Sequence, residues 1–393
     1  MVEFKDGFAA AQERAIAAYR EWPRKSFAEF MELVPIPDHI CKQGKDIKRF
    51  MSRQPAWLEG KELPWDVLFQ NIKGPRPRHT GLGVFGGCVY AQASLAAARA
   101  VEEEERQQKE ATGEAKPRPG IHSIQGIFTK PGLGDRPFVF DVCGIMSART
   151  FSGCRVDVRQ PKQPSSNPAG PFPDSDAGLP LNDICFSCIT TFKRPADGAD
   201  DVQSPESAQK RYADILSQRA PDQWEPAPLS DIDIITSLFP GAGHGAFPML
   251  DMYKVDMSEY NENKEVPDRR QLILYRPIKP VPKDDVNGHI ACHAFEADRN
   301  GLTMLANQLG YGFNMGMAAS LSYSFFVHTN PQDAVMDGEG WWIQEINWPR
   351  VGASRGMLES RIWSPDGKHV ASAFQDGIIV PARAPREARR TKL

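Results

Sequence analysis

The sequence predicts an α+β fold in which two antiparallel sheets, each wrapped around a buried helix, join edge to edge within one chain. Two observations carry this prediction. A helix pattern followed by four strand patterns occurs twice, and the strands of each repeat follow one another without helices between them. A parallel α/β sheet would alternate single strands with helices, so this order favours antiparallel sheets. Joining the two sheets along one edge also hides two sheet edges.

The first repeat begins with the glycine-rich segment 81–87, which leads into a helix predicted at Val89–Val101. Alanine dominates this helix, and its small side chains allow a sheet to pack closely over it. Four runs with strand character follow the helix. They lie at Ser123–Thr129, Pro137–Val142, Ser152–Arg159 and Ile184–Phe192.

The second repeat has its helix predicted at Gly301–Met317. Pro365-Asp366-Gly367 predicts a hairpin turn between the last two strands, because proline restricts φ and glycine permits positive φ. The third strands of the repeats align without a gap, with Arg155 opposite Arg361. The four predicted strands are Ser320–His328, Trp341–Ile346, Met357–Ser364 and Val370–Ile379.

Loops rich in charge, proline and glycine set the expected domain limits. Residues 1–195 hold the N-terminal region and the first repeat, and 231–382 hold the second repeat. The linker 196–230 between them is expected to carry a short helix at 208–218. We expect the basic tail 383–393 to be disordered, because Pro and Ala surround its arginines and no apolar period continues.

The composition indicates a soluble protein without a nucleic-acid role. The 393 residues are 41% hydrophobic and 25% charged, and a net charge of −3 gives no sign of polyanion binding. No run reaches the ~18 apolar residues that a spanning helix needs, and Met1–Asp6 lacks a signal-peptide pattern. The seven irregularly spaced cysteines favour a reducing compartment. Neither cysteines nor histidines have metal-ligand spacing, so we expect no metal and no cofactor.

Three short motifs are interpreted as coincidences. Gly352–Gly356 matches the GxSxG nucleophile pattern, but a strand pattern rather than a helix follows Ser354. Cys185 and Cys188 lack the second pair that a zinc ribbon needs, so we expect small buried side chains. The glycine-rich segment 241–245 lacks the strand–turn–helix setting of a phosphate-binding loop.

Three polar residues carry more information, although each also has a structural interpretation. Asp298 stands just before the second predicted helix, where aspartate is a favoured N-cap. Gln375 shares a strand face with Ala373, which leaves room for a ligand, although a glutamine on an edge strand facing water fits equally well. Ser320 opens a strand and shares its expected face with Ser322. For all three residues both interpretations stay open.

Four further passages of the chain match a known family. They are Gly83–Gln92, His122–Ser123 with Phe128–Gly132, Arg136–Val142 and Val370–Gly377. With these passages the chain resembles the type II acyl-CoA thioesterases, which are double hot-dog enzymes, in a form typical of fungi. The resemblance extends over roughly residues 30–382, outside the proline-rich insertions. It implies a double hot-dog fold and the hydrolysis of acyl-CoA thioesters to free acid and CoA.

The resemblance also implies a catalytic set of an Asp, a Thr or Ser, and a Gln around a nucleophilic water. Matched motif by motif, these fall on Asp298, Ser320 and Gln375. Bacterial relatives have Thr at the position of Ser320 and Gln at the position of Cys88. A thioester is activated enough that a positioned water suffices, without a covalent nucleophile.

Substrate binding is expected at Gly86, Gly87 and Cys88, where the positive end of the first helix would polarise the carbonyl. Two alternatives keep the fold: hydrolysis of an acyl or polyketide chain on a carrier protein, and a non-hydrolytic acyl binder recruited to another reaction. A hot-dog hydratase usually shows an Asp/His pair at one helix entrance, and no such pair stands near Asp298.

The last residues, Thr391-Lys392-Leu393, are close to the Ser-Lys-Leu peroxisomal address. We therefore expect a peroxisomal protein whose partners are acyl-CoA and an import receptor, with the cytoplasm as the alternative location. A homo-oligomer is compatible with the sequence, although one chain already supplies a pair of repeats.

Overall fold

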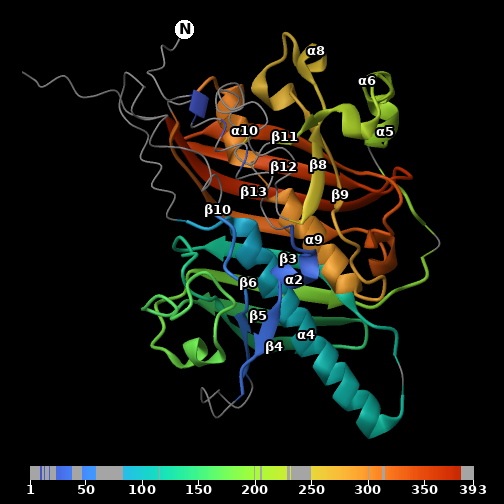
Figure 1. Cartoon of the computed structure of the whole chain (residues 1–393). Coiled ribbons are helices and arrows are strands. Elements are labelled where there is room, and N and C mark those ends of the chain that lie inside the picture. The colour runs from blue at the N-terminus through green and yellow to red at the C-terminus, as the bar shows by residue number, and fades with distance from the viewer. Residues whose placement is uncertain are drawn as a thin grey trace, which may run out of the picture.

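The computed structural model describes most of the chain outside its two ends. Within this part the strands form one 13-stranded antiparallel sheet, in the order β1-β2-β4-β5-β6-β3-β10-β13-β12-β11-β9-β8-β7. Helices α4 and α9 cross in front of it (Figure 1). The described ranges are 24–37, 47–58, 83–114 and 116–381, with gaps at 199, 204–205, 228–230, 232–248, 300 and 312–314, and four isolated positions between residues 9 and 17.

The first half of the sheet wraps around α4 (Gly86–Thr112), which contains the predicted helix and extends it at both ends. The helix ends at Gly113, which has a positive φ of 73° and so fits the left-handed C-cap that glycine favours. All four strands predicted here are confirmed. The strands of this half are β1 (Leu33–Pro35), β2 (Ile47–Ser52), β3 (Gly120–Phe128), β4 (Val139–Ser147), β5 (Phe151–Arg159) and β6 (Phe186–Lys193), preceded by the short helix α2 (Phe27–Phe30).

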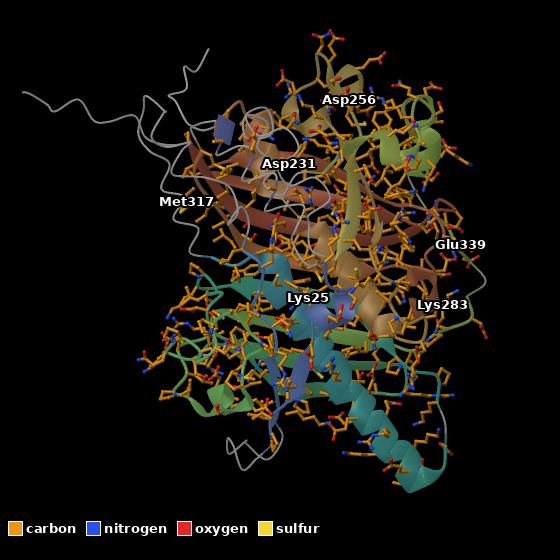
Figure 2. All side chains as sticks on the ribbon, viewed as in Figure 1. Lys25, Asp231, Asp256, Lys283, Met317 and Glu339 are labelled. Atoms are coloured by element: carbon orange, nitrogen blue, oxygen red, sulfur yellow. The ribbon has the colours of Figure 1, made fainter. Side chains whose placement is uncertain are left out.

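The second half repeats this arrangement, and its four predicted strands are also confirmed. The strand order β2-β4-β5-β6-β3 of the first half corresponds to β9-β11-β12-β13-β10 of the second. The strands of this half are β7 (Glu225–Pro226), β8 (Leu250–Lys254), β9 (Gln271–Pro277), β10 (Met315–Val327), β11 (Trp342–Gly352), β12 (Arg355–Trp363) and β13 (His369–Pro381). Figure 2 labels Met317 near the start of β10.

The two halves join where β3 pairs with β10, with Phe325 opposite Ile124. Both of these side chains are fully buried, so the joint between the halves is part of the core. The expected edge-to-edge arrangement is therefore present, and the pairing covers one edge of each half.

The helical part of the second half differs from the prediction. The expected helix Gly301–Met317 is shorter, because α10 spans only Gly301–Gln308 and Met315 already belongs to β10. The main buried helix is instead α9 (Val286–Ala297). Asp285 is its N-cap residue, and the Asp285 side chain accepts a hydrogen bond from the Gly288 amide at 2.9 Å. Helix α9 is buried along almost its whole length, so its sequence shows no polar face that would mark a helix.

The predicted linker packs against the second half in its described part. The expected short helix is present as two pieces, α5 (Ala208–Arg211) and α6 (Ala213–Leu216). Arg211 Nη1 and Tyr212 Oη donate hydrogen bonds to Glu345 of β11 at 2.7 and 2.8 Å. The remaining helices are α8 (Ser258–Asn261) and 3₁₀ turns at Asp174–Gly178, Pro221–Gln223, Val266–Asp268 and Pro331–Ala334.

The predicted domain limits at residues 195 and 231 remain a prediction. The basic tail 383–393 with Thr391-Lys392-Leu393, and the segment 241–245, lie outside the described residues. No helix in the described part of the chain combines the length and the apolarity that crossing a membrane requires.

Candidate active site

Asp298, Ser320 and Gln375 come from three elements and meet at one point. Asp298 ends α9, Ser320 lies in β10 and Gln375 lies in the neighbouring strand β13. The Gln375 side-chain amide donates from Nε2 to Asp298 Oδ1 at 2.5 Å and to Ser320 Oγ at 2.7 Å. The structure thus brings together the three residues that the family resemblance implied, with Gln375 as the bridge.

The amide bridge is buried. Asp298 is 4% exposed and Gln375 is 3% exposed, while Ser320 is half-buried. Gln375 Oε1 has no hydrogen-bond partner among the described residues. An unsatisfied buried acceptor costs about 1–3 kcal/mol, and such groups in folded proteins call for an explanation such as catalysis or ligand binding.

Asp298 lies between two helices. It is the C-cap residue of α9, with φ −82° and ψ −6°, and α10 begins three positions later at Gly301. A carboxylate at this end of α9 faces the negative end of the helix dipole, so its charge does not stabilise α9. The interpretation of Asp298 as a cap for the start of the following helix remains a prediction.

Gln375 is not on an edge strand. It pairs with Tyr323 of β10 on one side and with Leu358 of β12 on the other. Its neighbour Ala373, two residues earlier on the strand, is fully buried. The interpretation of a glutamine facing water is therefore wrong, and the small-residue face predicted from the sequence surrounds a buried amide.

Ser320 owes its position to an irregularity in β10. Its partner in β13 is Gly377, whereas Ser322 pairs with Asp376, so one extra residue lies between the two serines on β10. This bulge breaks the strict alternation that would place Ser320 and Ser322 on one face. Bulges of this kind re-aim side chains beside active sites, and here Ser320 is directed to Gln375.

The start of α4 in the first half approaches Asp298 closely. A Cβ atom at Gly86 would lie 2.9 Å from Asp298 Oδ2 and 3.1 Å from the Phe128 ring. A Cβ atom at Gly87 would collide with the Phe85 ring and lie 2.9 Å from the Phe295 carbonyl oxygen. The two glycines therefore let the backbone of this helix start reach the carboxylate from the other half.

Cys88 lies in the same helix turn but is not an activated nucleophile. Burial raises the pKa of its thiol to about 12, and the nearby Asp298 carboxylate also acts to raise it. A thiol at such a pKa stays protonated at neutral pH, and only the thiolate attacks efficiently. Its backbone amide donates a hydrogen bond to the Phe85 carbonyl at 3.1 Å. The amides of Gly86 and Gly87 precede it and are the first two of α4.

Two tyrosines that the sequence reasoning missed lie beside the site. Tyr90 and Tyr323 are fully buried, and their ring centroids are 4.4 Å apart. Burial raises the pKa of both hydroxyls, and Asp298 acts in the same direction. Tyr90 lies within the passage Gly83–Gln92 that carries the family resemblance, which was the available signal.

Glu296 is a second buried carboxyl that the sequence did not reveal. It is fully buried, and neither of its oxygens has a hydrogen-bond partner among the described residues. Burial raises its pKa well above the usual range, while Arg299 acts to lower it. Burial thus favours the neutral form of Glu296, because the cost of burying its charge exceeds the attraction of Arg299.

The two of these motifs that lie in the described part of the chain, Gly352–Gly356 and the Cys185/Cys188 pair, are not among the residues of this site. Ala353 and Ser354, both with positive φ, form the turn between β11 and β12. Cys185 and Cys188 are both buried, as expected. In the part of the chain that the structure describes, no group of three or more His, Cys, Asp or Glu side chains is arranged to hold a metal ion.

Comparison with known proteins identifies the fold of the chain. The acyl-CoA thioesterase II TesB2 from Mycobacterium marinum superposes with a TM-score of 0.55 at 17% identity, covering 92% of this chain and 99% of that one. A conserved protein with a hot dog fold from Alicyclobacillus acidocaldarius gives 0.50 at 13% identity, covering 91% and 98%. The α+β fold with its large antiparallel sheet is thus the double hot-dog fold.

Sequence comparison identifies the family. The chain is 23% identical over 312 residues to acyl-coenzyme A thioesterase 8 of Mus musculus, which covers 77% of this chain and 83% of that protein. The family model of the acyl-CoA thioesterase C-terminal domain matches residues 164–379, and that of the N-terminal domain matches residues 75–169. The chain therefore belongs to the type II acyl-CoA thioesterase family and is a thioester hydrolase.

Proposed function

We propose that the chain performs the acyl-CoA hydrolysis of its family with a water molecule held by Asp298, Ser320 and Gln375. Family membership supports the reaction. The observation that supports the site is the buried amide of Gln375, which binds both Asp298 and Ser320. Three polar groups from three elements converge there, beside the start of α4.

Asp298 is the general base of this proposal. It accepts a proton from the water as the water oxygen forms a bond to the thioester carbonyl carbon. The tetrahedral intermediate then collapses, the C–S bond breaks, and the sulfur leaves with its electron pair. The proton held by Asp298 passes to that sulfur, so the products are a free acid and the CoA thiol.

Gln375 and Ser320 position the water. Gln375 uses both of its amide hydrogens on protein partners, and its buried Oε1 can accept a hydrogen from the water. Ser320 accepts a bond from Gln375, so its own hydrogen is available to donate to the water oxygen. Positioning of this kind is effective because the water is already oriented before the reaction begins.

The start of α4 stabilises the negative charge that develops on the carbonyl oxygen. The first amides of a helix have no carbonyl acceptor one turn earlier, and those of Gly86 and Gly87 lie at this end of α4. The positive end of the helix dipole acts in the same sense. The base thus comes from the second half and the oxyanion site from the first.

Two further assignments belong to this proposal. The terminal Thr391-Lys392-Leu393 directs the chain to the peroxisome through an import receptor, where it takes part in lipid metabolism. A fluorescent fusion that stays in the cytoplasm with the tripeptide intact would contradict this location. The second assignment is self-association of the chain into a homo-oligomer, which a sedimentation measurement would detect.

The first test is thiol release from short, medium and long acyl-CoAs by wild type and Asp298→Asn. We expect the variant to lose on the order of a hundredfold or more in turnover, as for a lost general base. The matched control is Asp376→Asn, because Asp376 follows Gln375 on β13 and pairs instead with Arg355 at 2.7 Å. That control should keep most of its turnover.

The remaining outcomes separate the alternatives. Turnover that survives in Asp298→Asn would mean that the water is activated elsewhere. Absence of turnover on every CoA ester, with turnover on acyl carrier-protein thioesters, would move the substrate to a carrier-bound acyl chain. Binding of acyl-CoA without any hydrolysis would favour a non-hydrolytic binder.

A further inference from the structure

A basic hollow of about 640 Å³ lies in the first half of the molecule, outside the catalytic site. Its volume is within the range of small-molecule binding sites, roughly 300–1,000 Å³. The isolated bridge between Pro161 and Leu181 closes the base of the proline-rich insertion at one side of this hollow. The lining residues are Arg159, Lys162, Leu181, Asn182, Asp183 and Ile184.

The charges around the hollow favour an anion. Arg159, Lys162 and Lys130 all act to lower the pKa of Asp183, so the three cations surround one carboxylate. Lys130 Nζ lies 2.5 Å from Asp183 Oδ2, and Arg159 Nη1 lies 2.9 Å from Asp141 Oδ2. The cations outnumber these two carboxylates, and the exposed Lys162 supplies the positive charge that faces solvent.

The sheet register places this hollow at the same end of the sheet as Asp298, Ser320 and Gln375, which form the catalytic trio of the proposed function. Ser322 of β10 pairs with Ile127 of β3, so Ser320 lies level with the end of β3. Phe128 pairs with Phe186 at the start of β6, and Phe186 pairs with Val158, the residue before Arg159. The path from Ser320 to Arg159 therefore crosses the adjacent strands β10, β3, β6 and β5.

The distance along this path suits the arm of CoA. Three interstrand steps span ~14 Å. The pantetheine arm has as many chain atoms as about four residues, and four extended residues reach ~14 Å. The arm is therefore long enough to reach from a thioester carbonyl beside Asp298 to Arg159 and Lys162.

We propose that this hollow binds the phosphorylated nucleotide end of CoA, with Lys162 contacting a phosphate group. This inference rests on the proposed function, because it takes the acyl end of the substrate to be at Asp298. Lysine binds phosphate as a point charge, and arginine offers several donors in a fixed geometry. Because Arg159 also pairs with Asp141, Lys162 is the cation whose replacement disturbs the fold least.

The test combines one charge reversal with two substrates. Lys162→Glu is compared with Lys283→Glu, a control of equal charge change at an exposed lysine labelled on the opposite side of the molecule from the 160–184 loops (Figures 1 and 2). The substrates are an acyl-CoA and the same acyl group on pantetheine, which lacks the nucleotide. Because pantetheine cannot reach a phosphate site, it reports on the catalytic trio alone.

We expect Lys162→Glu to raise KM for acyl-CoA on the order of tenfold, the scale of a lost hydrogen bond to a charged group. Its kcat and its KM for acyl-pantetheine should be unchanged, and Lys283→Glu should match wild type on both substrates. An unchanged KM for acyl-CoA, or an equal rise for both substrates, would overturn the proposal.

A binding experiment separates this inference from the proposed function. Adenosine 3′,5′-bisphosphate is titrated into wild type and Lys162→Glu by calorimetry, which requires no turnover. Binding to wild type that weakens in Lys162→Glu supports the nucleotide site even if acyl-CoA is not hydrolysed. Lack of binding to wild type, or equal binding to both proteins, overturns it even if hydrolysis is confirmed.

Discussion

Helix α4 of the first half runs unbroken for 27 residues, whereas the second half divides its helical segment between α9 and α10. The break in the second half is where Asp298 lies. Because Asp298 follows the last residue of α9, its carboxylate lies beside Gly86 at the start of α4 in the other half. The same fold thus supplies a carboxylate from one half and a helix start from the other.

The N-terminal ends of α9 and α4 also differ from one another. At the start of α9, Asn287 accepts a hydrogen bond from the Ile121 amide at 2.8 Å and donates one to Glu102 Oε1 at 3.0 Å. The Asp285 side chain also accepts a hydrogen bond from the Gly288 amide at 2.9 Å, so a protein side chain satisfies one of the first amides of α9. At the start of α4, Gly86 and Gly87 carry no side chain, and the backbone faces Asp298. Protein side chains thus occupy the start of α9, whereas the start of α4 is where we propose that the substrate binds.

Among the tests of this comparison, the largest effect is expected from removing the amide that bridges Asp298 and Ser320. Gln375→Ala deletes the bonds to both Asp298 and Ser320, so the water loses its orientation. We expect turnover to fall about a hundredfold, the scale of a small misplacement in an active site. Steady-state kinetics on acyl-CoA measure this. Turnover within twofold of wild type would show that Gln375 only supports the fold.

A smaller loss is expected from filling the space at the start of α4. Gly86→Ala places a Cβ atom 2.9 Å from Asp298 Oδ2, so the carboxylate must move. We expect turnover to fall on the order of tenfold. Gly83→Ala is the control, because its Cβ would meet only Pro131 at an ordinary 3.4 Å. Equal turnover in the two variants would mean that the approach of α4 to Asp298 is not important.

A substitution at the start of α9 should lower the stability of the protein and leave its activity unchanged. Asn287→Ala leaves the buried amide of Ile121 without its acceptor, at a cost of about 1–3 kcal/mol. Urea unfolding measures the change in free energy. We expect kcat on acyl-CoA to stay within twofold of wild type. A large fall in kcat with unchanged stability would reverse the roles assigned to the two helix starts.

The smallest effect is expected from pH. Burial lowers the pKa of His369 to about 4, and His328 and His122 are also shifted downward. Each imidazole takes up a proton more readily in the unfolded chain than in the folded protein, so stability is lost as pH falls from 6.5 towards 4. Thermal unfolding in this range should be less pH-dependent in His369→Gln. An unchanged slope would mean that other groups carry the pH dependence.

The sequence predicted what depends on local periodicity. Strands β5 and β12 were located within two residues at each end, because alternating side chains mark a strand in any context. Helix α9 was not found, because it is buried along almost its whole length and contains Gly288, so neither periodicity nor propensity marks it. The predicted part of α4, Val89–Val101, is also buried along almost its whole length, but its alanines mark it as a helix.

The candidate site could be predicted only in part for a related reason. The motif passages led to Asp298, Ser320 and Gln375, but periodicity placed Ser320 on the wrong face, because it cannot detect the extra residue in β10. Glu296 and Tyr323 became visible only through tertiary burial. Contacts between distant elements have no local sequence signal, and the site consists of such contacts.

The pairing of β3 with β10 has a consequence for assays at low enzyme concentration. In a site assembled from two separate chains, dilution below the dissociation constant would separate the proposed base from the proposed oxyanion donors. Here both belong to one polypeptide and one hydrogen-bonded sheet, so their effective concentration is fixed by the covalent connection. Specific activity should therefore remain constant on dilution, with or without further self-association.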